Sequence, residues 1–453
     1  MPILPIDTGR YGTDEMRRIF DETSRLQKIL DVEAAAAFAQ SEVGNIPKDA
    51  AQEIMMKANT SNVRIERCKE IDKQINHDLM AVVKALSEVC SPSAARWVHF
   101  GLTSADVEDT AYALQFKEAI YLIQNGLVSI EKTLMRLVEK HRDTMMAGRT
   151  HGQHMAVITL GLKLAVWMRE VSRHLKRLTQ TKERVLVGKI MGAIGTGAGL
   201  GEHAIEIQNI ALTRLGLRPA DMVTQVIQRD LHAELISTLT LIGTSLEKFA
   251  LEIRNLQRTE IMELMEPFKI ESQVGSSAMP SKRNPVKSER ICSLARLLRG
   301  MLIPAYENIA LWHERDLTNS ANERFIFSMS FILLDEMTYA MRNILAELVV
   351  LPENMKRNLA ITGGLFISEN VVKELVQRGL GRQEAHELVR KCSMKAITEK
   401  EAFSEVLAKE PQVSNLIPEK DISALLDYSE YLGVTQELID NALASTRAEL
   451  TQY

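Results

Sequence analysis

The sequence predicts an all-α fold organised around a bundle of long helices. Apolar residues recur alternately four and three positions apart, which places one apolar stripe along each helix. These stripes run over residues 116–137, 160–178, 239–256 and 331–348. No proline lies between Pro92 and Pro219, which leaves room for helices well beyond the usual length of about 12 residues. No segment alternates apolar and polar residues for long enough to predict a substantial sheet.

The pattern divides the chain into three expected domains. Residues 1–110 mix shorter helices with glycine and proline breaks and form an N-terminal helical domain. Residues 111–350 carry the long helices and form the central bundle, in which residues 291–309 contain Gly300 and Pro304 and predict a kink. Residues 351–453 return to shorter helices and form a C-terminal helical domain. Apolar stripes on more than one side of the long helices also suggest that subunits share a bundle.

Composition excludes several classes of protein. The chain has 453 residues, a net charge of -4, 45% hydrophobic and 25% charged residues, which favours neither nucleic acid nor an anionic membrane as partner. Its four cysteines lack metal-ligand spacing and are expected to be reduced thiols. The N-terminal residues have no signal-peptide pattern, and no run of about 18 apolar residues predicts a membrane span. A soluble cytoplasmic protein is therefore expected.

A glycine-rich run, GAIGTGAGLG at residues 192–201, superficially resembles a phosphate-binding loop. It lacks the Gly-Lys-Ser/Thr ending, has no preceding strand pattern and does not fit G-x-G-x-x-G. We interpret it as a turn between two helices.

Three histidines stand in polar company and are candidates for chemistry. His151 lies within GRTHGQH, His77 precedes Asp78, and His99 precedes a Thr103-Ser104 pair that predicts a helix start. Taken singly, each of the three histidines fits a capping or core role better than a catalytic one. None shows the spacing of a metal site, so no metal is expected.

The stretch GSSAMPSKRNPVKSE, residues 275–289, is a polar, proline-punctuated loop between helical segments. Gly275 and the serines after it can present backbone N–H and hydroxyl groups to an anionic oxygen. Lys282 and Asn284 add a cation and an amide that suit a carboxylate or phosphate. The residues alone equally allow a solvated surface connector. Together with the cationic segments 10–12 and 312–324, they indicate a helical enzyme that binds a small polyanionic ligand.

These segments match a known family. GSSAMPSKRNP resembles the signature loop of the fumarase/aspartase superfamily, whose members release fumarate from succinyl-bearing substrates. RYGTDEM, NHD, WVHFGLTSADVEDT, GRTHGQH, TQVIQRD and LWHERDLTNSANER resemble, in order and spacing, the adenylosuccinate lyase family within it. The resemblance runs from about residue 8 into the expected C-terminal domain.

The resemblance implies a three-domain, mostly α fold whose central helices form a twenty-helix core in a homotetramer, with active sites shared between subunits. It implies β-elimination of a C–N bond, with no metal and no organic cofactor. The implied substrates are small nucleotides: adenylosuccinate, which gives AMP, and succinylaminoimidazole carboxamide ribotide, which gives AICAR. Fumarate is released from each.

The resemblance also assigns roles to residues. Ser276 is implied as the base and His151 as the acid that protonates the leaving nitrogen. His77 would assist, Lys282 would hold a succinyl carboxylate, and Glu289 would lie near a histidine and raise its basicity. The implied substrate contacts are Arg10, Tyr11, Asn76, Asp78, His99, Thr103, Ser104, Gln225, Ser277, Arg283, Asn284, Arg290, Arg315, Ser320 and Arg324.

Two positions depart from the family pattern, and two rival functions stay open. Ser281 stands where many members carry His or Tyr, and Asn76 stands where many carry Arg, so a neutral phosphate contact is expected at Asn76. One rival is a 3-carboxymuconate cycloisomerase or another fumarate-releasing relative, which the nucleotide-facing segments disfavour. The other is a catalytically inactive structural relative, which the presence of the acid, the base and the lysine disfavours.

Overall fold

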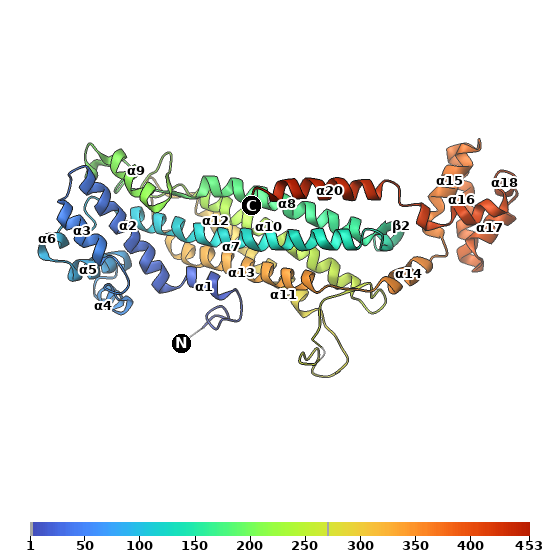
Figure 1. The fold of residues 1–453 in the computed structure, drawn as a ribbon, viewed down its shortest axis with the longest axis horizontal. Helices are drawn as coiled ribbons and strands as arrows, with labels where there is room; N and C mark the ends of the chain where they lie inside the picture. Colours follow the sequence, from blue (N-terminus) through green and yellow to red (C-terminus); the bar gives the residue numbers. More distant parts are fainter. Residues whose placement is uncertain (1–2, 270) are drawn as a thin grey trace. The chain divides into compact units, whose positions relative to one another are not determined.

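The computed structural model describes residues 3–269 and 271–453 (Figure 1). Its helices are α1 (Asp14–Ile19), α2 (Glu22–Glu42), α3 (Lys48–Lys57), α4 (Ile65–Ile75), α5 (Asp78–Val89), α6 (Pro92–Ala95), α7 (Ser104–Lys140), α8 (Leu160–Val185), α9 (Ala204–Leu215), α10 (Arg229–Leu256), α11 (Val286–Gly300), α12 (Leu302–Glu307), α13 (Ser320–Ala346), α14 (Pro352–Ala360), α15 (Ser368–Gln377), α16 (Arg382–Glu399), α17 (Phe403–Lys409), α18 (Pro411–Ser414), α19 (Glu419–Leu425) and α20 (Thr435–Leu450). The strands are β1 (Met145–Thr150), β2 (Gln153–Thr159), β3 (Val187–Gly188), β4 (Arg218–Pro219), β5 (Leu264–Met265) and β6 (Val349–Val350).

The all-α prediction is confirmed. α7, α8, α10 and α13 have 37, 26, 28 and 27 residues; the first three contain their apolar stripes in full, and α13 contains the fourth up to residue 346. The strands form only two-stranded pairs within the described residues: β1 with β2, β3 with β4, and β5 with β6. The glycine-rich run lies between α8 and α9, as predicted. All four cysteines are free thiols.

The chain divides into two compact units. The first comprises residues up to Leu127 together with Arg173–Lys248 and Arg290–Met341, and the second comprises Val128–Ser172, Phe249–Glu289 and Arg342–Tyr453. Each long helix contributes residues to both units. The three-domain division at residues 110 and 350 stays a prediction.

An aromatic core holds the long helices of the first unit together. The fully buried Phe116 of α7 lies 5.1 Å from Phe327 and 5.8 Å from Phe331, ring centroid to centroid, and both partners belong to α13. A Cβ at Gly243 of α10 would lie 2.6 Å from Leu298 of α11, so only glycine allows these two helices to approach this closely. Burial of such large aromatic side chains makes this core a main source of stability.

The N-terminal helices of the first unit surround a second apolar cluster. α2 packs against α3 and α9, and α4 packs against α5 (Figure 1). Asp21 caps α2, since its carboxylate accepts the Ser24 N–H at 2.6 Å. Leu30 and Leu86 are among the fully buried residues of the cluster. The packing fixes α2 as the central support of this region.

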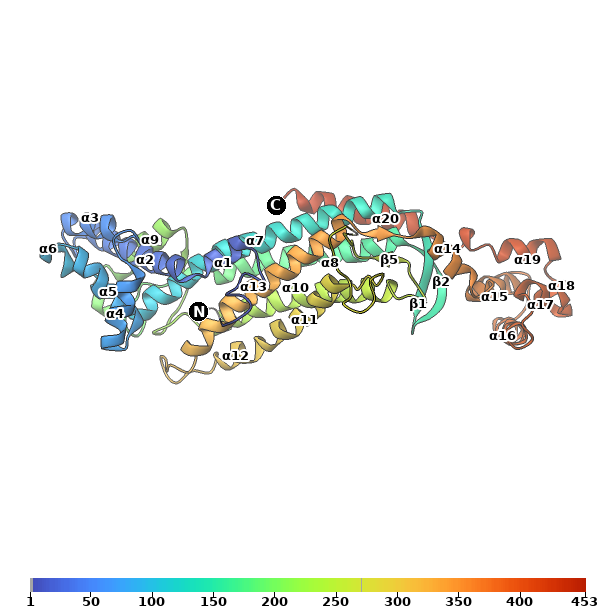
Figure 2. The same cartoon turned by 90° about the horizontal axis from the view of Figure 1, so that it is seen from below.

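The second unit contains its own helix contacts and a C-terminal cluster. Trp167 of α8 stacks on Phe249 of α10 with ring centroids 4.9 Å apart. Arg169 of α8 pairs with Glu449 of α20 at 2.9 Å. Helices α15 to α19 gather around buried residues that include Leu375 and Leu407 (Figure 2).

At the predicted kink within residues 291–309 the helix is interrupted for one residue, Met301. α11 ends at Gly300 and α12 begins at Leu302, with Pro304 in its first turn. Proline lacks the N–H that a continuous helix needs and is tolerated in the first turn, so a new helix start accommodates it. Among the helices described, none is long and apolar enough to cross a membrane.

Candidate active site

The turn at residues 76–78 joins α4 to α5 and determines which ring nitrogen of His77 carries the proton. Asn76 ends α4 in the left-handed conformation, with φ of 52°. The His77 Nδ1 accepts the Met80 N–H at 3.3 Å and thereby caps α5. Because Nδ1 acts as an acceptor here, the ring proton of neutral His77 resides on Nε2. The expected capping role and a role in chemistry are therefore compatible.

Asp78 lies next to His77 in a small charged cavity. Its carboxylate is 2.7 Å from the Arg324 guanidinium and 3.8 Å from that of Arg25. The cavity, of about 210 Å³, is also lined by Glu108 of α7. Burial opposes ionisation of Asp78, but the hydrogen bond and charge of Arg324 outweigh it and lower the pKa. Burial and the neighbouring Asp78 raise the pKa of Glu108.

The turn at residues 99–104 leads into α7, which begins at Ser104 as the sequence predicted. The Asp106 carboxylate accepts the Thr103 N–H at 2.8 Å, as in a capping box. Asp106 also pairs with the fully buried Lys189 at 2.5 Å. A Cβ at Gly101 would lie 2.7 Å from the Gly199 carbonyl oxygen, so the turn packs directly on the glycine-rich run.

A cationic cluster surrounds the ring of Tyr11. The guanidinium carbons of Arg10 and Arg290 lie 5.8 Å and 5.9 Å from the centroid of this ring. Arg290 also pairs with Glu336 at 2.8 Å. The predicted residues Arg10, Tyr11 and Arg290 are thus neighbours in the first unit.

Two further predicted residues meet through a hydrogen bond. Arg315 donates from Nη1 to the Gln225 side-chain oxygen at 3.2 Å. The buried Nε of Arg315 has no partner in the described part of the chain. Ser320 is the first residue of α13. An unpaired buried N–H of this kind can bind an anionic oxygen.

In the second unit, His151 lies at the tip of the hairpin formed by β1 and β2. His151 and Gly152 form its two-residue turn, with φ of 53° and 76°, between the paired residues Thr150 and Gln153. Both turn residues are exposed. The pair formed by Arg149 and the buried Glu263, at 2.6 Å, anchors the base of the turn.

The loop at residues 275–285 is closed by its own backbone. The Asn284 side chain donates to the Gly275 carbonyl at 2.8 Å, and a Cβ at Gly275 would lie 2.0 Å from the Lys282 carbonyl oxygen. The Ser276 hydroxyl accepts two backbone N–H groups, from Ala278 at 3.3 Å and Met279 at 3.1 Å. Glycine is required at residue 275 because no side chain fits between this residue and the backbone of Lys282.

A cavity of about 730 Å³ lies beside this loop. Lys282, Arg283, Asn284 and Glu289 line it, and Glu289 lies in the first turn of α11. Ser277 is exposed on the loop. Lys282, Arg283, Asn284 and Glu289 therefore share one depression, while Ser276 and Ser277 are not among the described residues that line it.

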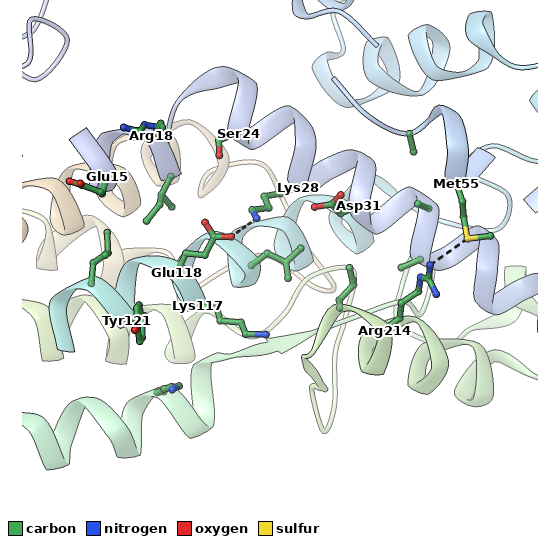
Figure 3. Close-up of a pocket in the computed structure, with 18 residues that line it drawn as sticks. Glu15, Arg18, Ser24, Lys28, Asp31, Met55, Lys117, Glu118, Tyr121 and Arg214 are labelled. Atoms are coloured by element: carbon green, nitrogen blue, oxygen red, sulfur yellow. Dashed lines mark hydrogen bonds and ion pairs between the residues drawn. The ribbon is translucent and has the colours of Figure 1, made fainter. Parts of the chain in front are cut away.

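A cavity of about 1000 Å³ in the first unit is lined by none of the predicted site residues (Figure 3). It is lined by charged side chains of both signs, and Lys28 of α2 pairs with Glu118 of α7 across it (Figure 3). No group of His, Cys, Asp or Glu side chains within the described ranges is placed to hold a metal ion.

Comparison with known proteins identifies the family. A family model described as "Lyase" matches residues 9–300, and one described as "Adenylosuccinate lyase C-terminus" matches residues 364–442. The adenylosuccinate lyase of Pyrococcus abyssi is 50% identical over 443 residues, which cover 98% of each chain. The chain belongs to the adenylosuccinate lyase family. Those of Methanocaldococcus jannaschii and Bacillus subtilis are 44% and 41% identical, over 99% and 93% of this chain and 96% of each relative.

Solved structures extend the likeness to other branches of the superfamily. A 3-carboxy-cis,cis-muconate lactonizing enzyme from Pseudomonas putida has a TM-score of 0.90 and 32% identity, and a fumarate lyase from Mesorhizobium sp. BNC1 has 0.89 and 32%. The alignment with each covers 98% of this chain and 100% of the solved chain. The overall fold is thus shared with these two enzymes, while the higher identities lie with adenylosuccinate lyases.

Two charged residues that line the cavity beside Asp78 were not predicted from the sequence. Arg25 and Glu108 line the same cavity as Asp78 and Arg324. Glu108 stands four positions after Ser104, one helical turn away, and that spacing was a usable signal. Arg25 has no such signal, because it reaches the cavity from α2 through tertiary packing alone.

Proposed function

We propose that this member of the adenylosuccinate lyase family eliminates fumarate from adenylosuccinate, giving AMP, and from succinylaminoimidazole carboxamide ribotide, giving AICAR. The observation that carries the proposal is 50% identity to an adenylosuccinate lyase over 98% of both chains. In this reaction a base removes a proton from the succinyl carbon next to a carboxylate. The C–N bond then breaks, and the leaving nitrogen takes a proton from an acid.

Ser276 is proposed as the base. A serine hydroxyl must lose its proton to act in this way, so its environment has to favour the alkoxide. The two backbone N–H groups that point at the Ser276 oxygen, from Ala278 and Met279, support this role. Lys282 and Asn284 of the same loop are proposed to hold the succinyl carboxylates, on which negative charge accumulates after proton removal.

His151 is proposed as the acid and His77 as its assistant. The exposed position of His151 at a hairpin tip lets its ring reach a bound substrate. His77 offers an Nε2–H donor, because its Nδ1 is engaged by the Met80 N–H. Glu289, in the first turn of α11, is proposed to raise the basicity of a histidine in the assembled site.

Phosphate and carboxylate groups of the substrate are proposed to bind the cationic clusters. The pairs of guanidinium groups near Tyr11 and near Asp78 support this, as do the unpaired Arg315 Nε and the loop cations. The proposed contacts, beyond those already given roles, are Arg10, Tyr11, Asn76, Asp78, His99, Thr103, Ser104, Gln225, Ser277, Arg283, Arg290, Arg315, Ser320 and Arg324.

We also propose a cytoplasmic homotetramer in which subunits share active sites. The long helices expose large apolar side chains, among them Tyr121 of α7, Val166 of α8 and Leu251 of α10. Apolar faces on core helices favour a bundle shared between chains.

The test is direct. The protein is incubated with adenylosuccinate, and the release of AMP and fumarate is measured over time. Equal amounts of the two products are expected. Succinylaminoimidazole carboxamide ribotide is tested as the second substrate. 3-Carboxymuconate serves as the control for the rival activity. Turnover of both nucleotides supports the proposal, and turnover of carboxymuconate alone overturns it. Light scattering that gives the mass of one chain would contradict the tetramer.

A further inference from the structure

Glu33 is a buried carboxylate that no proposed role of the enzyme uses. It lies on α2 with a side chain that is 1% exposed, and its Oε1 is 2.6 Å from the His99 Nδ1. An ionised carboxylate is costly to bury unless a charged or hydrogen-bonded partner compensates it. The distance indicates a short, charge-assisted hydrogen bond from the Nδ1–H to the carboxylate. Glu33 and His99 therefore form a buried dyad.

Side chains of α2 hold the turn that carries His99 through hydrogen bonds to two successive residues, His99 and Phe100. Gln40 stands seven positions after Glu33, hence on the same helix face, and donates to the Phe100 carbonyl at 2.9 Å. His99 itself has a left-handed backbone, with φ of 62°, which is uncommon for residues other than glycine. Such strain persists where surrounding contacts impose it, and at functional sites it often has a purpose.

The other ring nitrogen of His99, Nε2, is available to bind a ligand. Within residues 3–269 and 271–453, the His99 Nε2 has no hydrogen-bond partner, and the side chain is 11% exposed. Burial lowers the pKa of His99, but the Glu33 charge and hydrogen bond and the Asp106 charge outweigh it, so the pKa is raised. Asp106 is itself paired with Lys189, which leaves Glu33 as the main counter-charge.

We propose that Glu33 is a positioning residue for the lyase reaction: it holds His99 as an imidazolium and directs the Nε2–H at an anionic oxygen of the substrate. The proposal rests on the proposed function and deepens it. Glu33 does not contact substrate; it acts through His99. The anionic oxygen belongs either to the succinyl group or to the phosphate. A purely structural pair would fasten the turn equally well, so the test has to separate the two roles.

The decisive variant is Glu33→Gln, which keeps the size of the side chain and a hydrogen-bond acceptor but removes the charge. We expect KM for adenylosuccinate to rise about tenfold or more, with a smaller change in kcat, because a charge-assisted contact in the bound state is lost. The alkaline limb of the kcat/KM profile moves to lower pH, since His99 then loses its proton earlier. Glu33→Asp, which keeps the charge, restores part of both effects. A profile that does not move overturns the proposal.

Gln40→Ala is the matched control. It releases the same turn from the same helix face but leaves the Glu33 charge in place. We expect a modest loss of activity with an unshifted alkaline limb. An equal shift in both variants would mean that loosening of the turn, and not charge, explains the result.

Competition assays identify which anionic oxygen of the substrate His99 contacts. Inhibition by fumarate and by AMP is compared between the wild type and Glu33→Gln. Weaker inhibition by fumarate alone places His99 at the succinyl group, and weaker inhibition by AMP alone places it at the phosphate. Unchanged inhibition by both overturns the proposal.

A readout without substrate separates this inference from the proposed function. The pKa of His99 is raised in the folded protein, so the pair stabilises the fold at low pH, and this stability is lost as pH rises through the folded-state pKa. The wild type should therefore exceed Glu33→Gln in Tm by more at pH 6 than at pH 9. If wild type fails to release fumarate while this difference holds, the proposed function fails and the charged dyad stands. If the difference is absent, the charged dyad fails whatever the activity.

Discussion

The Asp78 carboxylate lies 2.7 Å from the Arg324 guanidinium, which joins the first residue of α5 to α13 across 246 residues of sequence. Each side chain is 40% exposed, so the pair lies in the mouth of a cavity where both members can also reach a ligand. The arrangement places the Arg324 cation next to the carboxylate that orients it.

Loss of this cation should weaken substrate binding. We expect Arg324→Ala to raise KM for adenylosuccinate about 10- to 100-fold, since a charged hydrogen bond is worth about 1.5–3 kcal/mol. Asp78→Ala should have a smaller effect. The double variant should lose less than the sum of the two single losses, because the residues act as a pair. Strictly additive losses in steady-state kinetics would show that they act independently.

Removal of the proposed acid or base should slow the chemical step. We expect Ser276→Ala and His151→Ala each to lower kcat about 10²- to 10⁴-fold with an unchanged Tm, since both side chains lie in exposed loops. Ser281→Ala, in the same loop, is the control and should retain wild-type kcat. Wild-type rates in either of the first two variants would refute the assigned role.

A methyl group at residue 275 should disturb the loop without unfolding the protein. The new Cβ of Gly275→Ala would lie 2.0 Å from the Lys282 carbonyl oxygen, so the loop must move. We expect kcat/KM to fall about tenfold or more, because displacement of groups near the reacting atoms is costly to catalysis. Gly300→Ala is the control, since a Cβ there meets nothing within 4 Å. Full activity of Gly275→Ala would show that the closed loop is not needed.

A buried ion network should dominate the stability of the first unit. Arg229 contacts Asp109 and Glu323, at 2.8 Å each, and all three side chains are at most 5% exposed. Arg229→Leu leaves two buried carboxylates without a counter-charge and should cost about 3–5 kcal/mol. Chemical denaturation measures the loss. Arg390→Ala, which removes an exposed helix pair with Glu387, should leave the unfolding midpoint unchanged.

The buried His232 should make the fold sensitive to mild acid. Burial first, and then the Arg229 charge, lower its pKa from 6.5 to about 3. The unfolded chain therefore binds a proton between these values that the folded chain does not, and stability falls as pH drops below 6.5. At pH 5 this effect approaches about 2 kcal/mol. Between pH 7 and pH 5, the Tm of His232→Phe should fall by less than the Tm of the wild type. An identical pH dependence of both proteins would contradict this.

The long helices could be predicted because each carries its own apolar period, and the stripe of residues 116–137 falls inside α7. The break between Gly300 and Leu302 was signalled only as a kink, since glycine and proline mark an irregularity without fixing its form. Candidate residues within the quoted segments could be named from local pattern and resemblance.

Partners across the fold could not be named from sequence. Glu33 meets His99 across 66 residues, and Arg25 lies beside Glu108 and Asp78 only because α2 packs as it does. Neither residue stands in an unusual local pattern. Such contacts depend on tertiary structure, which helical periodicity does not encode.

The placement of His151 and Gly152 in a two-residue hairpin turn has an evolutionary consequence. Insertion of a single residue there would either replace the two-residue turn by a longer loop or shift the pairing of β1 with β2, which would turn the side chains of one strand to the opposite face. Such a change would also move the histidine from the tip. Drift by insertion or deletion is therefore far more restricted at this turn than in an ordinary surface loop, and length variation among descendants of this chain should accumulate elsewhere.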